Sequence, residues 1–144
     1  MNSKRIFQMV LAGVLCAVGM AVPMFMPKIV LGPMSFTLAS HVPVFLAMFI
    51  SPMVALAVCI GSALGFFVTT PLIIALRAAS HIVFALLGAW LLKKKPGLAG
   101  GYVMSVLGLV GGGTMLHSLI DFSIAAVLWR AVCSGVPQLK LLKD

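Results

Sequence analysis

The sequence predicts an all-α integral membrane protein, on the strength of its composition, its long apolar segments and the grouping of its basic residues. Of its 144 residues, 62% are hydrophobic and only 8% are charged. Soluble domains carry about 25% charged residues, so this chain has too few to cover a water-exposed surface. The Lys and Arg residues gather between apolar segments, as in cytoplasmic loops. We therefore expect contact with membrane lipid and no nucleic acid partner, despite a net charge of +8.

The apolar segments predict six short transmembrane helices in one domain, residues 1–144. Gly32-Pro33 is a turn signal in the stretch after the first span, which we expect to form an ordered outer loop. The apolar run that follows contains Ser51-Pro52 and could form one kinked helix or two short ones. With two short helices, the predicted spans are 6–26, 37–51, 52–69, 71–92, 98–111 and 114–134.

The positive-inside rule decides between one helix and two. Lys4-Arg5 and Lys93–Lys95 should both be cytoplasmic, which requires an even number of spans between them. Two short helices on either side of Ser51 give four spans, whereas a single kinked helix gives three. The six-span arrangement places both the N-terminus and the C-terminus in the cytoplasm.

Two charged residues lie inside predicted spans. Asp121 is in 114–134, and Arg77 is in 71–92. A charge in the hydrocarbon costs about 2.5–3.5 kcal/mol, so it rarely persists without a partner or a role.

Helical rise places the polar groups at comparable depths. Arg77 and His81 lie about 9 and 15 Å from the outer end of their span, on one face. His117 and Asp121 lie about 4–5 and 10 Å from the outer end of theirs. His41 opens the second span from the same side. We therefore expect all five groups in the outer half of the bundle, with Arg77 and Asp121 level.

Two hypotheses explain this group. Arg77 and Asp121 could form a structural ion pair, with the histidines bonded to backbone carbonyls. Alternatively, the group could line a pocket for a small anionic molecule, with Arg77 binding a carboxylate or phosphate. Asp121 would then orient Arg77 or accept a proton from the ligand, and His81 and His117 would contact the ligand ring.

A metal site and an enzyme active site are less well supported. Three histidines and Asp121 suit zinc or nickel, but Arg77 would repel a cation, so we expect no metal. Asp121 is the only carboxylate predicted within the membrane, and no G-x-S-x-G, H-E-x-x-H or P-loop motif is present. We expect no enzyme activity.

Small residues at four-residue spacing favour close helix contacts in lipid. Gly13, Ala17 and Ala21 follow this spacing in the first span, and Gly61 and Gly65 in the third. Either group could serve internal packing or contact with a partner protein.

The six helices, the broken loop and Ala17-xxx-Ala21 resemble the S component, or substrate-binding subunit, of energy-coupling factor (ECF) vitamin transporters. Residues 27–52, PKIVLGPMSFTLASHVPVFLAMFISP, are similar to the S components of niacin uptake. The resemblance implies a multi-pass protein of the bacterial plasma membrane. Such a subunit binds its vitamin beneath the loop after the first span. It then docks on a transmembrane coupling protein, the T component, which carries two ATPases.

The resemblance also implies roles for particular residues. Ala17 and Ala21 match the docking motif, and Gly13 extends the same face. Phe36 and Thr37 join the five polar groups as binding candidates from the loop. ATP would be used by the partner subunits, with no cofactor in this chain.

The ligand and one further alternative stay open. Nicotinate, a small aromatic carboxylate, agrees with Arg77 beside imidazoles, but pantothenate, biotin and lipoate are carboxylates too. The remaining alternative is a stand-alone small membrane channel or assembly protein with a structural Arg77–Asp121 pair.

Overall fold

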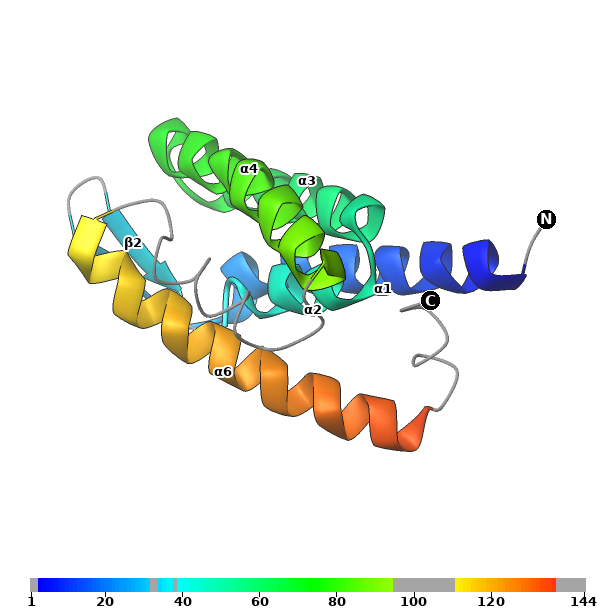
Figure 1. Cartoon of the computed structure of the whole chain (residues 1–144). Coiled ribbons are helices and arrows are strands. Elements are labelled where there is room, and N and C mark those ends of the chain that lie inside the picture. The colour runs from blue at the N-terminus through cyan, green and yellow to red at the C-terminus, as the bar shows by residue number, and fades with distance from the viewer. Residues whose placement is uncertain (1–2, 32–33, 38, 95–110, 137–144) are drawn as a thin grey trace.

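The computed structural model describes residues 3–31, 34–37, 39–94 and 111–136 (Figure 1). The predicted fifth span, 98–111, lies outside these ranges except for its last residue. That residue, Gly111, begins the final helix, which therefore starts three residues earlier than predicted. In chain order, the described elements are α1 (Ser3–Phe25), β1 (Lys28–Leu31), β2 (Met34–Thr37), α2 (Val42–Ile50), α3 (Pro52–Thr69), α4 (Leu72–Lys94) and α6 (Gly111–Gly135).

Three of the described helices, α1, α3 and α4, are long and apolar enough to cross a membrane. The predicted break between the second and third helices is confirmed. Ser51 is extended, its hydroxyl accepts a hydrogen bond from the Val54 N–H at 3.3 Å, and Pro52 begins α3. Proline is well tolerated there because a first-turn N–H has no partner within the helix.

The predicted second span, 37–51, is wrong in its extent. Its helix, α2, has nine residues and is about 13–14 Å long, less than half the thickness of the hydrocarbon core. It begins at Val42 because the preceding residues end a strand and form a turn. Most of α2 is buried, so it is an internal element of the bundle.

The described residues are mostly helical, as predicted, but the stretch after α1, expected to be an ordered outer loop, forms a β-hairpin. β1 and β2 are antiparallel, with Lys28 opposite Thr37 and Leu31 opposite Met34. Pairing the strands satisfies backbone groups that a loop would leave to water. The Lys28 ammonium donates to the Thr69 carbonyl at 3.2 Å, which ties the hairpin to the C-terminal end of α3.

The connections between elements define two ends of the molecule. The hairpin, the turn between α3 and α4, and the beginning of α6 lie at one end, on the left in Figure 1. α1 begins and α6 finishes at the opposite end. α4 runs away from the hairpin, and Leu92 near its end joins Ile50 and Val54 in one buried cluster.

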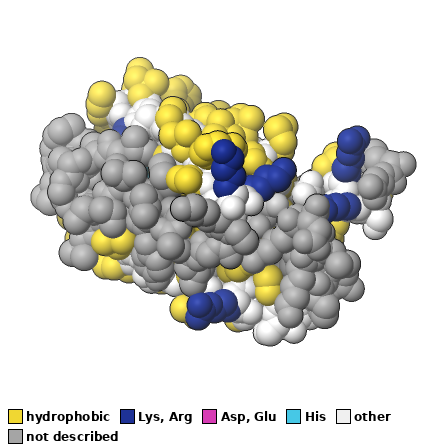
Figure 2. All heavy atoms as spheres, viewed as in Figure 1, with side chains coloured by type: hydrophobic (Ala, Val, Ile, Leu, Met, Phe, Trp, Pro, Cys, Tyr) yellow, Lys and Arg dark blue, Asp and Glu magenta, His cyan; other side chains and the backbone are white. Residues whose placement is uncertain are grey.

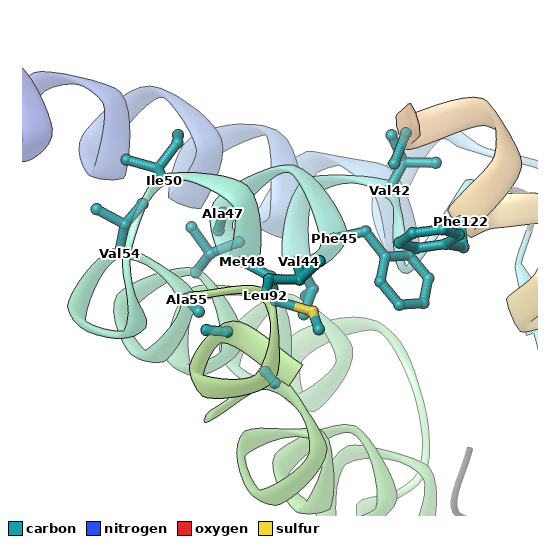
Figure 3. Close-up of a cluster of buried hydrophobic side chains, with 14 of the residues drawn as sticks. Val42, Val44, Phe45, Ala47, Met48, Ile50, Val54, Ala55, Leu92 and Phe122 are labelled. Carbon is teal, nitrogen blue, oxygen red and sulfur yellow. The ribbon is translucent and has the colours of Figure 1, made fainter. Parts of the chain in front are cut away.

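That cluster is built around α2, which packs against α1, α3, α4 and α6 (Figure 3). Phe45 meets Phe122 edge to face, with ring centroids 5.1 Å apart. One turn later, Phe49 stacks on the buried Trp129 at 5.4 Å. These aromatic pairs fix α6 against α2 and so determine the height of Asp121 relative to the beginning of α2.

The outer surface of the bundle is apolar. Phe25, Met53 and Val68 are 81%, 72% and 71% exposed. In Figure 2, hydrophobic side chains cover the visible faces of α3 and α4, while Lys and Arg gather in a few places. This surface suits contact with lipid tails.

Gly61 and Gly65 serve internal packing, one of the two roles expected for them. A Cβ on Gly65 would lie 2.7 Å from the carbonyl oxygen and 2.8 Å from the Cα of Met20 on α1. A Cβ on Gly61 would meet the sulfur of Cys16. The backbones of α1 and α3 therefore approach too closely for any side chain at Gly65.

We expect Gly65→Ala to lower the thermal unfolding midpoint of the purified protein in detergent. The added methyl forces two backbones apart, and overpacking of this kind costs about 1–3 kcal/mol. Gly13→Ala is the matched control, because nothing lies within 4 Å of a Cβ there. Equal midpoints for the two variants would contradict the close contact.

Candidate functional site

Asp121 on α6 is fully buried and holds the segment that leads into α2. Its Oδ1 accepts a hydrogen bond from the Ala39 N–H at 3.1 Å, and its Oδ2 accepts one from the His41 N–H at 2.9 Å. His41 is the residue at the N-cap of α2, and its own side chain does not cap the helix. A carboxylate is favoured at a helix N-terminus, where unpaired N–H groups and the helix dipole attract negative charge.

The His41 side chain is held by the same carboxylate. Its Nδ1 lies 3.2 Å from Asp121 Oδ2 and 3.2 Å from the Ser40 hydroxyl oxygen. An ionised carboxylate can only accept, so the contact with Asp121 favours the tautomer that carries its proton on Nδ1. Asp121 thus fixes both the backbone and the ring of His41.

A second imidazole lies beside the first. The His81 ring, on α4, is tilted by 56° to the His41 ring, with centroids 4.7 Å apart. Phe84 meets His81 edge to face at 5.2 Å, and Phe45 lies 6.1 Å from His41. α2 and α4 therefore place two imidazoles in contact beside an aromatic cluster.

Thr37, the last residue of β2, lies four residues before His41 in the chain. Its side chain is 1% exposed, and its hydroxyl oxygen has no hydrogen-bond partner in the part of the chain that the structure describes. A buried hydroxyl without a partner costs about 1–3 kcal/mol, so it points to a missing partner. Phe36, beside it on β2, is half-buried and pairs with Ile29 on β1.

A strained turn connects Thr37 to His41. The Ser40 N–H donates to the Thr37 carbonyl at 3.1 Å, and Ala39 adopts a φ of 61°. This left-handed conformation costs a non-glycine residue about 1–3 kcal/mol. The bond from the Ala39 N–H to Asp121 helps to offset that cost.

Of the two hypotheses for this group, the structural Arg77–Asp121 ion pair is wrong. Arg77 is half-buried on α4, one turn before His81. Within the described part of the chain, the close side-chain contact of Asp121 is with the His41 imidazole, at 3.2 Å. Equal depth along two helices does not fix the direction in which each side chain points. The carboxylate turns toward the start of α2, where two backbone N–H groups and an imidazole are available.

The structure thus brings together three of the five polar groups predicted to converge, His41, His81 and Asp121. His117 lies on α6 one turn before Asp121, but its side chain is outside the described ones. Among the described side chains, no group of three or more His, Cys, Asp or Glu could hold a metal ion. The His117 side chain is not among them, so the expected absence of a metal stays a prediction.

Sequence reasoning missed Ser40 and the backbone of Ala39, because both were assigned to a transmembrane helix. The signal was present in Pro43, which occupies the first turn of α2 and marks a helix start near Val42.

The predicted docking residues lie on α1. Gly13 and Ala17 are exposed, and Ala21 is half-buried. Gly61 and Gly65 pack against the other side of α1, so this outward face is available for contact with lipid or another protein.

Comparison with known proteins identifies the family. No family model and no solved structure matches the chain. The chain is 33% identical to the niacin transporter NiaX of Lactococcus lactis subsp. cremoris (strain MG1363), over 94% of its own length and 79% of the relative's. This similarity confirms the predicted resemblance to niacin-type S components. The chain belongs to the family of the niacin transporter NiaX.

Proposed function

We propose that this chain is the S component of a bacterial ECF transporter, and that it binds nicotinate at the hairpin end of the bundle. The relative is named as a niacin transporter, and the helices suit a multi-pass protein of the plasma membrane. The observation that carries the proposal is the contact between the buried His41 imidazole and the half-buried His81 imidazole, with Asp121 bonded to His41. The Thr37 hydroxyl, four residues before His41, has no hydrogen-bond partner among the described residues.

The proposed topology has six spans, with both termini in the cytoplasm and the hairpin outside. The beginning of α1, with Lys4 and Arg5, lies at the end opposite the hairpin. Lys93 and Lys94 finish α4, which runs away from the hairpin. These placements support the proposal, because four basic residues then lie on the cytoplasmic side.

The proposed ligand contacts follow from charge and shape. Nicotinate is flat, aromatic and anionic. Arg77 and His81 lie one turn apart on α4, where the guanidinium would bind the carboxylate and the imidazole would contact the ring. Phe36 and Thr37 would approach from the hairpin, and His117 from α6. The role of Asp121 would be to position His41.

Transport would depend on partner subunits. We infer that the face formed by Gly13, Ala17 and Ala21 docks on the T component, because small side chains permit close helix contact in lipid. The two ATPases would hydrolyse ATP, and this chain would act by binding alone, without a cofactor.

Native mass spectrometry of the protein purified from rich medium tests the function directly. We expect an adduct with the mass of nicotinate, and calorimetry should then show tighter binding of nicotinate than of pantothenate, biotin or lipoate. An adduct of one of these other vitamins would keep the S component but change its substrate. A protein that binds none of them would contradict the proposal.

Arg77→Ala should weaken nicotinate binding by about 10- to 100-fold, because a charge-assisted hydrogen bond is worth about 1.5–3 kcal/mol. Calorimetry measures the affinity, and the protein should still fold. Arg130→Ala is the matched control, because Arg130 is exposed and lies more than two helical turns after Asp121 on α6. Unchanged affinity in Arg77→Ala would remove Arg77 from the site.

Asp121→Ala should reduce the yield and thermal stability of the folded protein. It leaves the N–H groups of Ala39 and His41 without their acceptor, at about 1–3 kcal/mol for each buried group. Because Arg77 is not its partner, the double variant Arg77→Ala/Asp121→Ala should be no more stable than Asp121→Ala alone. Restored stability in the double variant would reinstate a structural Arg77–Asp121 pair.

Ala17→Trp should leave nicotinate binding intact and abolish uptake in cells that contain the coupling module, because the indole would prevent close docking. Val127→Trp, on an exposed site of α6, is the control and should transport normally. If Ala17→Trp still transports, α1 does not provide the docking face.

A further inference from the structure

Thr37 has a fixed position, and among the described residues its hydroxyl has no hydrogen-bond partner. Its backbone pairs with Lys28 across the hairpin, and its carbonyl accepts a hydrogen bond from Ser40. The next residues are held through the Ala39 and His41 N–H groups, which donate to Asp121. With 1% of its side chain exposed, Thr37 cannot reach water from this position. A ligand in the proposed site is therefore the natural partner for its hydroxyl.

The charges around the site distinguish its two sides. The turn that follows Thr37 is bonded to the carboxylate of Asp121, which repels another carboxylate. The face contributed by α4 carries the imidazole of His81 and, one turn away, the guanidinium of Arg77. In the proposed site, these groups would orient an anionic ligand with its carboxylate toward α4. The opposite edge of the ligand then faces the turn and Thr37.

We propose that the Thr37 hydroxyl donates a hydrogen bond to the ring nitrogen of nicotinate and thereby makes the site selective for pyridine carboxylates over benzoate. The proposal rests on the function inferred above and specifies which hydrogen bond recognises the ligand. The ring nitrogen has one in-plane lone pair and can only accept, whereas a hydroxyl can donate. Benzoate carries a C–H group at that position and would leave the buried hydroxyl unpaired, which is how a site rejects a close analogue.

Calorimetry with nicotinate and benzoate tests the proposal. Thr37→Val removes the hydroxyl but keeps the shape of the side chain, and Thr37→Ser keeps the hydroxyl as the matched control. The wild type should prefer nicotinate, and Thr37→Val should lose about tenfold in affinity for nicotinate with no loss for benzoate. Thr37→Ser should keep the preference. Equal losses for both ligands, or no loss for either, would overturn the assignment.

A second measurement needs only the wild-type protein, in case Thr37→Val does not fold. N-methylated nicotinate has the same carboxylate but no lone pair on the ring nitrogen, and it should bind at least about tenfold more weakly than nicotinate. Comparable binding of the two would overturn the proposal. A wild type that does not bind nicotinate at all would overturn the proposed function itself, and the assignment to Thr37 with it.

Discussion

The fold at the hairpin end depends on one buried carboxylate. Asp121 accepts hydrogen bonds from the backbone of Ala39 and His41 and contacts the His41 ring. It joins α6 to α2 across 80 residues of sequence and holds a turn that contains a left-handed alanine. A lone acidic residue in an apolar segment is thus explained by the backbone groups at the start of a short helix, which need an acceptor where water is scarce.

This arrangement connects the stability of the fold to the proposed binding site. The side chain that anchors α2 also orients an imidazole, and the second imidazole, His81, comes from α4, which packs on both α3 and α2. Aromatic side chains support both rings, with Phe84 against His81 and Phe45 near His41. A preorganised group of this kind limits the entropy lost when a small rigid ligand binds.

Sequence reasoning found the apolar helices, the break at Ser51 and the residues that converge at one end, because each has a local signal in hydropathy, proline placement or helical depth. It could not find the hairpin, whose short strands are as apolar as the helices around them. It also kept Arg77 as a structural partner of Asp121 in one of its two hypotheses, because depth along a helix says nothing of rotation about its axis. Asp121 contacts His41 because of the position of α2 along α6. Side-chain packing, such as that of Phe45 on Phe122, sets this position.

The contact at Gly65 has a mechanical consequence. Because no side chain separates α1 from α3 there, neither helix can slide or tilt without the other. α1 leads directly into β1, and the far end of α3 holds Lys28. A displacement of the outward face of α1 would therefore be transmitted to the hairpin, because α1 is continuous with β1 and α3 is bonded to Lys28.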